Sequence, residues 1–173
     1  GAKQALYNIA SVLINPGDEV ILPCPYWVSY SDIIKLKGGI PVEIQTSLNN
    51  NFKMTGEQLR GAITNKTKMI WFSSPCNPSG SVYNKNELQE IVDVIESYKN
   101  IFVVSDEIYE HINYHGKHLS IGSFDNIKDR TITVNGVSKA FAMTGWRIGY
   151  IGGPEWIARA CNKVQGQVTS GAN

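Results

Sequence analysis

Residues 135–150 read Asn-Gly-Val-Ser-Lys-Ala-Phe-Ala-Met-Thr-Gly-Trp-Arg-Ile-Gly-Tyr and follow a run of β-branched residues at 131–134. Such a run is typical of a buried strand, and the Asn-Gly pair after it is a turn signal. Lys139 is therefore expected just beyond the carboxyl end of a strand, where open α/β sheets bind their ligands. Arg147 follows closely. The pair suggests an amine nucleophile beside an anion clamp, although most such cations are simply solvated.

The segment from Ser138 to Tyr150 resembles the lysine signature of class I aminotransferases, the aspartate aminotransferase family of pyridoxal-phosphate (PLP) enzymes of fold type I. The match is long and specific. The resemblance implies that Lys139 forms a Schiff base with pyridoxal 5'-phosphate and that Arg147 binds the cofactor's phosphate. It also implies an L-amino acid and a 2-oxo acid as substrates, a ping-pong Schiff-base mechanism, and a homodimer as the working form of the full-length protein.

The composition is that of an ordinary soluble globular protein. The 173 residues are 42% apolar and 18% charged, with a formal net charge of +1. This balance gives no support for binding to nucleic acid or to an anionic membrane. The chain has neither an apolar run of transmembrane length nor a signal peptide at its start. Three widely spaced cysteines favour reduced thiols and a cytoplasmic location.

Both ends of the chain look cut, because it opens without an initiator methionine and stops inside a polar stretch. Members of the family it resembles are considerably longer. We therefore expect residues 1–173 to form a single domain, the central part of the PLP-binding large domain, without the N-terminal segment and the C-terminal small domain. A fragment that binds the cofactor but is inactive remains an alternative.

Alternating strand and helix patterns predict an α/β fold, a three-layer α/β/α arrangement around a mainly parallel sheet. The expected strands are residues 19–22, 40–44, 69–72, 101–104, 131–134 and 148–151. Pro41 places the second of these near an edge of the sheet. The expected helices are 3–14, 29–37, one that follows a capping box at Thr55, one capped by Asn84 or Asn86, and one from 154 to 165. The resemblance implies that 148–151 is the one antiparallel strand and that a seventh strand precedes Gly1.

The start of the first helix is a candidate phosphate site. Gly1, Ala2 and Lys3 would present free amide groups there, as the first turn of any helix does. The resemblance assigns Ala2 and Lys3 to the cofactor phosphate, with a plain helix start as the alternative. Some family members carry a hydroxyl residue three positions before the lysine, where this chain has Gly136, so phosphate binding is expected to depend more on Arg147 and the helix amides.

Four further residues are assigned to the cofactor ring by the resemblance. Trp27, rather than its neighbour Tyr26, would stack on the ring, because a rigid aromatic supplies contact area at low entropic cost. Asn77 and Tyr109 would hold the phenolic oxygen. Asp106 would face the ring nitrogen and keep it protonated, since a close opposite charge favours the charged form. Taken alone, each is as well explained as a core, turn or cap residue.

Three histidines give the main rival signal. His111, His115 and His118 would share one side of a regular helix and could ligate zinc. Gly116 interrupts the pattern, so we expect no metal site and a polar, exposed loop instead.

The family resemblance favours an aspartate aminotransferase, in which Lys139, Asp106 and Tyr109 are the catalytic residues. An aromatic, alanine or other class I aminotransferase remains an alternative, because the substrate-binding arginine of the family would lie beyond this segment. A different class of function, an inactive scaffold that binds partners through an exposed sheet edge, is the second hypothesis.

Overall fold

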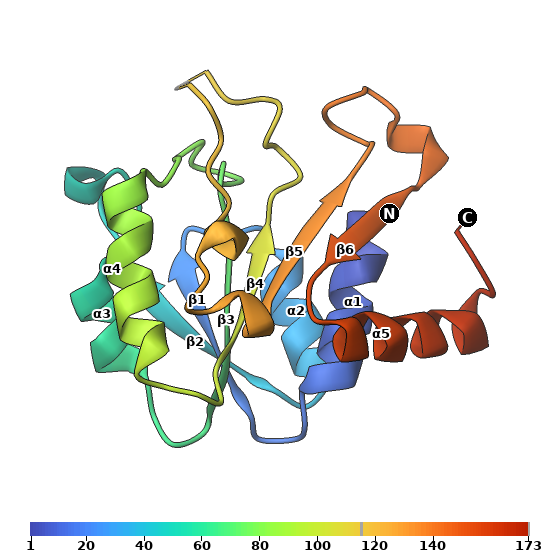
Figure 1. The fold of residues 1–173 in the computed structure, drawn as a ribbon, viewed down its shortest axis with the longest axis horizontal. Coiled ribbons are helices and arrows are strands. Elements are labelled where there is room, and N and C mark those ends of the chain that lie inside the picture. The colour runs from blue at the N-terminus through green and yellow to red at the C-terminus, as the bar shows by residue number, and fades with distance from the viewer. Residues whose placement is uncertain (115, 173) are drawn as a thin grey trace.

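The computed structural model describes residues 1–114 and 116–172, and within them a six-stranded sheet carries helices on both faces (Figure 1). The strands are β1 (Glu19–Cys24), β2 (Ile40–Gln45), β3 (Thr67–Ser73), β4 (Phe102–Asp106), β5 (Thr131–Gly136) and β6 (Gly149–Gly152). Their order across the sheet is β2-β1-β3-β4-β5-β6, and only β5 and β6 pair antiparallel. The predicted α/β fold with one antiparallel strand is confirmed.

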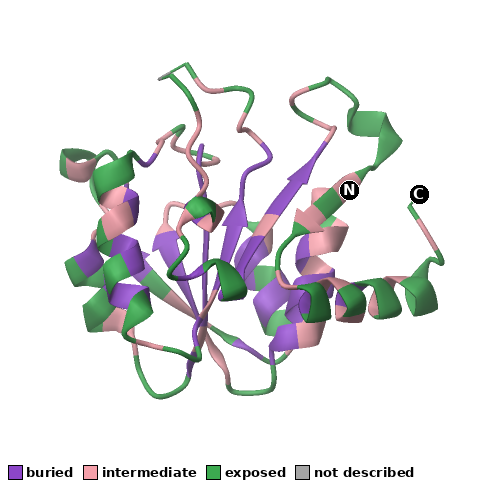
Figure 2. Ribbon diagram, in the orientation of Figure 1, coloured by how far each residue is buried: buried purple, intermediate pink, exposed green. Residues whose placement is uncertain are grey.

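The four central strands, β1, β3, β4 and β5, bury both of their faces, which explains why they read as continuous apolar runs, whereas the edge strands β2 and β6 are largely exposed. Trp71 of β3 faces one core and Phe72 faces the other. The first core packs against α1 (Ala2–Leu13), α2 (Ser29–Leu36) and α5 (Glu155–Val168), and the second against α3 (Gly56–Ala62) and α4 (Lys85–Glu96). Figure 2 shows the buried strands between helices whose outer faces are exposed. None of the described helices is long and apolar enough to cross a membrane.

The predicted elements are all found, with shifts of a few residues at their ends. The strand at the edge is β2, as Pro41 indicated. Asn84 is the cap of α4, and both it and Thr55 form complete capping boxes. One prediction is wrong: Asn135 and Gly136 do not turn the chain but extend β5, because they pair with Tyr150 and Gly149 of β6.

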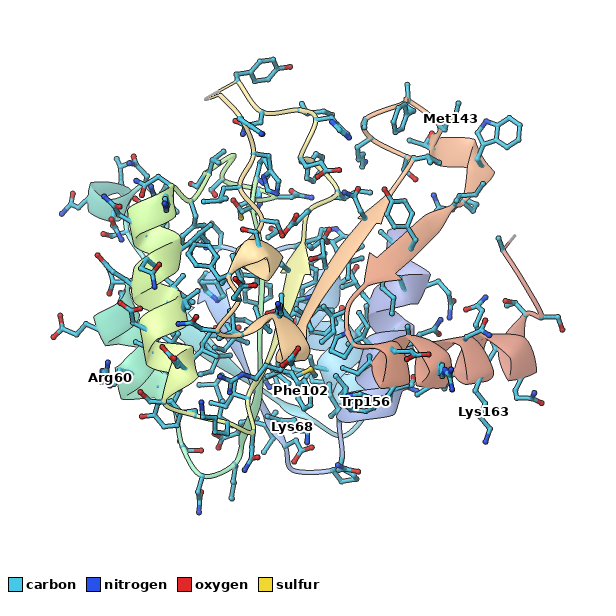
Figure 3. The ribbon with its side chains drawn as sticks, viewed as in Figure 1. Arg60, Lys68, Phe102, Met143, Trp156 and Lys163 are labelled. Carbon is cyan, nitrogen blue, oxygen red and sulfur yellow. The ribbon has the colours of Figure 1, made fainter. Side chains whose placement is uncertain are left out.

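The parallel strands point their carboxyl ends toward the same edge of the sheet, the end of the molecule where Figure 3 labels Met143. The opposite end is marked in Figure 3 by Lys68, Phe102 and Trp156. There the Lys68 ammonium lies 5.3 Å from the Phe102 ring centroid, and Trp156 packs against the same ring. The long connections after β4 and β5 therefore gather at the Met143 end, away from this aromatic cluster.

Candidate active site

A cavity of ≈ 300 Å³ lies at the carboxyl edge of the sheet. All eight site residues predicted from the sequence line it: Ala2, Lys3, Trp27, Asn77, Asp106, Tyr109, Lys139 and Arg147. They come from the start of α1 and from the ends of β1, β3, β4 and β5 or the loops that follow. A larger hollow of ≈ 710 Å³ runs along α1 and α5, but it holds neither the buried carboxyl group nor Lys139. The smaller cavity is therefore the candidate site.

Asp106 is the buried charge-bearing group of the cavity, with only 3% of its surface exposed. One carboxyl oxygen accepts a hydrogen bond from the Tyr30 hydroxyl at 2.7 Å, and the other accepts one from the Ile108 amide at 3.2 Å. Burial raises the pKa of Asp106 to about 6, and the two hydrogen bonds oppose this rise. A cationic atom of a ligand placed against this carboxyl group would favour its ionised form.

Tyr30 is a site residue that the sequence analysis missed. It is fully buried, its ring stacks on Trp71 at 5.2 Å between centroids, and Trp27 meets it edge-on at 5.7 Å. Burial, with the neighbouring Asp106 charge, raises the pKa of the Tyr30 hydroxyl well above its usual value. The group therefore stays protonated and remains a donor to Asp106. Its position three residues after Trp27, at the start of α2, was the available signal.

The cavity also contains a buried hydroxyl group, near Tyr30, whose hydrogen bonding within the described residues is incomplete. Ser73 ends β3 and lines the cavity, and its hydroxyl makes no hydrogen bond of normal geometry among the described residues. A buried hydroxyl of this kind is usually satisfied by a ligand or a water. Its place at the carboxyl end of a strand could have indicated it. Three further lining residues are Ile108, Ser138 and Thr144.

Lys139, Tyr109 and Asn77 approach the cavity from three different loops. The Lys139 ammonium lies 5.8 Å from the centroid of the Tyr109 ring. Asn77 lies in a turn after β3 that is closed by hydrogen bonds between Cys76 and Ser81 and between Gly80 and Cys76. An amine, a phenol and an amide can thus act on one ligand.

Trp27 lines the cavity and Tyr26 does not, which leaves Trp27 as the aromatic residue placed to stack on a bound ring. The Lys3 ammonium lies 4.7 Å from the Trp27 ring centroid. Tyr26 instead donates a hydrogen bond to Glu43 at 2.5 Å, and it does not line the cavity. Trp27 therefore supplies a flat apolar wall next to a cation.

A candidate anion site lies where the start of α1 meets the residues before β6. Gly1 caps α1 without a side chain, so its first amide groups are available to a ligand. The Gly1 nitrogen donates to the Arg147 carbonyl oxygen at 2.5 Å, and the Arg147 guanidinium donates to Thr144 O at 2.7 Å. Arg147 has a φ of 52°, a left-handed conformation found at functional sites more often than elsewhere. The Arg147 guanidinium lies beside the helix start, next to Gly1.

Two glycines allow this close approach. A Cβ atom on Gly149 would lie 2.3 Å from the Ala2 nitrogen, and one on Gly1 would lie 2.7 Å from a guanidinium nitrogen of Arg147. Gly136 stands three positions before Lys139, where a hydroxyl residue was one possibility for phosphate binding. A Cβ on Gly136 would lie 2.7 Å from Ile148 O. The antiparallel pairing with β6 therefore leaves no room for a side chain at that position.

Neither of the two described histidines, His111 and His118, lies on a helix. His111 is exposed and contacts Glu110 and the Phe141 ring, whereas His115 lies outside the described residues. His118 is largely buried, so the expectation of an exposed loop is wrong for this residue. Its hydrogen bond with Glu107 raises the pKa of its imidazole, partly opposed by burial.

Among the described residues, one group has the spacing of metal ligands. The side-chain ligand atoms of His118, Glu107 and Glu110 lie within 4.8 Å of one another. Serine hydroxyls and the His118 imidazole already occupy the Glu107 oxygens, and Asn135 donates to Glu110. We therefore assign no metal to it.

Comparison with known proteins gives consistent matches over the whole chain. A family model described as aminotransferase class I and II matches residues 1–173. The chain is 46% identical to a bifunctional aspartate aminotransferase and glutamate/aspartate-prephenate aminotransferase of Petunia hybrida, covering 100% of this chain and 36% of the relative. It is 47% identical to an aspartate/prephenate aminotransferase of Nitrosomonas europaea, covering 100% of this chain and 44% of the relative.

Solved structures agree with these matches. The aspartate aminotransferase of Rhizobium meliloti superposes with a TM-score of 0.98 at 43% identity, over 100% of this chain and 44% of that one. An aromatic aminotransferase of Pyrococcus horikoshii superposes with a TM-score of 0.94 at 42% identity, over 98% of this chain and 45% of that one. The chain thus spans less than half the length of the curated relatives it matches.

Proposed function

Because the chain belongs to the aminotransferase class I and II family, we propose that it provides the cofactor-binding site of a pyridoxal-phosphate-dependent aminotransferase. The observation that carries this proposal is the single cavity in which Lys139, the buried Asp106 and Arg147 meet the start of α1. These groups offer an amine, a carboxyl group and an anion site to one ligand.

The residues of the cavity fit pyridoxal 5'-phosphate. When bound, this cofactor supplies an aldehyde that links to amines and a protonated ring that withdraws electrons. The buried carboxyl of Asp106 suits a cationic ring nitrogen, and the Trp27 wall suits a flat ring. Asn77 and Tyr109 would hold the phenolic oxygen, and the set that would hold the phosphate is Ala2, Lys3 and Arg147.

The chain's own residues would divide the chemistry among them. Lys139 Nζ would bind the aldehyde carbon of the cofactor. As a free amine, the same Nζ would remove the proton from the substrate α-carbon and deliver it to the cofactor's C4′, acting first as base and then as acid. Asp106 would hold the proton on the ring nitrogen, while Tyr109 donates to the phenolic oxygen.

L-aspartate is the amino donor that we propose, with a 2-oxo acid as the acceptor. The names of the Petunia and Nitrosomonas relatives support aspartate, and both also name prephenate, which makes prephenate the second candidate acceptor. Aromatic amino acids are the alternative amino donors, because the similar structures include the Pyrococcus aromatic aminotransferase. Full-length protein assayed with aspartate, phenylalanine and alanine as donors would separate these choices. We further propose a cytoplasmic homodimer in which this segment is one domain.

The test is a visible spectrum of full-length protein with added pyridoxal 5'-phosphate. We expect an absorbance band of lysine-bound cofactor in the wild type and in the control Lys163→Ala, because Lys163 is exposed on α5 and does not line the cavity. The band should be lost in Lys139→Ala. Borohydride reduction and peptide mapping should find the cofactor on Lys139, and attachment to any other lysine would refute the proposed role.

A further inference from the structure

Glu107 lies beside the cavity but points into a cluster of donors behind it. Its side chain is almost fully buried, and it does not line the cavity. One carboxyl oxygen accepts hydrogen bonds from Ser105 at 2.9 Å and from Ser120 at 2.7 Å, and the other is bonded to His118 Nε2 at 2.9 Å. We refer to Ser105, Glu107, His118 and Ser120 as the Glu107 cluster.

Half of the cluster is fixed to the sheet. Ser105 belongs to β4, and the Glu107 amide donates to Val134 O of β5 at 2.9 Å, continuing the ladder between these two strands. Strands in the middle of a sheet are among the least mobile parts of a protein. The Glu107 carboxyl group is therefore a fixed acceptor.

The other half of the cluster lies beyond a long loop. Figure 1 shows the chain leaving the sheet after β4 and returning before β5. His118 and Ser120 lie where this loop returns. Ser120 also accepts from the Gly122 amide at 3.1 Å, and the adjacent Ile121 is buried in the second core. The Glu107 carboxyl group thus joins the two ends of the loop.

Tyr109 stands on the first turn of this loop. The Glu110 amide donates to Glu107 O at 2.9 Å and the Ile112 amide donates to Tyr109 O at 2.8 Å, which winds the turn directly onto Glu107. Tyr109 lines the cavity, whereas no member of the Glu107 cluster does. The turn that carries Tyr109 therefore starts from the residue that the cluster holds.

A buried carboxyl group surrounded by polar donors adds little net stability compared with an apolar packing of the same volume. Its value is more often in the geometry that it fixes. We propose that the Glu107 cluster is a positioning device that holds Tyr109 so that its hydroxyl meets the phenolic oxygen of the bound cofactor. This inference rests on the proposed function.

The experiment measures the pH at which the visible band of bound cofactor changes in full-length protein. A donor to the phenolic oxygen favours its ionised form, so Tyr109→Phe should raise the midpoint of this titration. If the cluster positions Tyr109, then Glu107→Gln, His118→Gln and Ser120→Ala should raise it too, by about half a pH unit or more. In a double variant with Tyr109→Phe, each cluster substitution should raise the midpoint little further, because the effects of coupled residues are not additive.

Two matched variants serve as controls. Ser123→Ala removes a hydroxyl whose hydrogen bond, within the part of the chain that the structure describes, goes to the backbone oxygen of Ser120 and not to a side chain of the cluster, and His111→Gln removes an exposed imidazole from the same loop. Both should keep the wild-type midpoint. If Tyr109→Phe shifts the midpoint while the three cluster variants do not, even with lowered thermal stability, the cluster is only structural and the inference is wrong.

A second measurement does not need the cofactor. Amide hydrogen exchange of residues 108–114 in cofactor-free protein should quicken in Ser120→Ala, the mildest change, and stay at the wild-type rate in Ser123→Ala. Equal rates in both variants would overturn the inference. A wild type without any cofactor band but with this exchange difference would refute the proposed function and leave the clamping of the loop supported.

Discussion

Asp106 lines the cavity, but its burial there disfavours the ionised carboxyl group. Its pKa of about 6 lies above its usual value of 3.8, because burial disfavours the charged form. Between these two pH values the folded state binds more protons than the unfolded state, so stability falls as the pH rises toward 6 and stays low above it. A shift of this size corresponds to about 3 kcal/mol.

We therefore predict that Asp106→Asn stabilises the cofactor-free protein by about 1–3 kcal/mol at pH 7.5, because the amide carries no charge to bury. The gain should shrink as the pH falls toward 4. Urea unfolding of the full-length protein at a series of pH values measures this difference. A gain that is independent of pH, or a loss at pH 7.5, would contradict the assigned cause.

Tyr30 supplies the hydrogen bond that most strongly opposes the rise in the pKa of Asp106. We predict that Tyr30→Phe raises this pKa further, by about one unit, since the ionised carboxyl group loses a donor. Carbon NMR of the Asp106 carboxyl group against pH measures it. Tyr26→Phe is the matched control, because Tyr26 bonds to Glu43, and an equal shift in both variants would exclude the specific role of Tyr30.

At the residue scale the sequence predicted the groups that a family pattern names, and missed those that act through them. Lys139 and Asp106 belong to short signatures that can be read along the chain. Tyr30 bonds to Asp106, which lies 76 residues away in the sequence. Glu107 bonds to Ser120, which lies 13 residues away. Such pairings depend on which strands are neighbours, and a single sequence does not contain that information in local form.

At the scale of elements, the junction between α1 and β6 depends on Gly149. We predict that Gly149→Ala moves β6 away from the start of α1, because the added Cβ would meet backbone atoms that cannot turn aside. Overpacking of this kind costs about 1–3 kcal/mol and should weaken cofactor binding about tenfold or more. Fluorescence titration with pyridoxal 5'-phosphate and a thermal melt measure the two effects.

Gly152→Ala is the control for this prediction. Gly152 lies in the same strand, and a Cβ added there would meet nothing within 4 Å. If both variants bound the cofactor equally well, the close approach of α1 and β6 would not be what builds the anion site.

The elements themselves were predictable because their patterns are local. Short apolar runs, helical spacing and the capping boxes at Thr55 and Asn84 located the described strands and helices to within a few residues. The Asn135-Gly136 pair was misread, because its turn propensity is overridden by pairing with β6. For Asn135 and Gly136, pairing between strands therefore outweighed the local turn propensity.

At the scale of the whole molecule, the site is distributed along the chain rather than concentrated in one segment. The sheet order β2-β1-β3-β4-β5-β6 brings the carboxyl ends of β1, β3, β4 and β5 together, with the start of α1 beside them. The alternation of strands and helices predicted a parallel sheet, and a parallel sheet predicts a site at this edge. The family resemblance was needed to say which residues meet there, since composition and periodicity do not specify spatial order.

The bond between Gly1 and Arg147 joins positions 146 apart in the sequence, with nearly all of the sheet between them. During synthesis the start of α1 leaves the ribosome long before Arg147 does. A chain that still lacks Arg147 and Lys139 could offer helix amides to a phosphate, but neither the guanidinium nor the amine of the proposed site. Under the proposed function, cofactor binding is therefore expected only after the sheet between these positions has assembled.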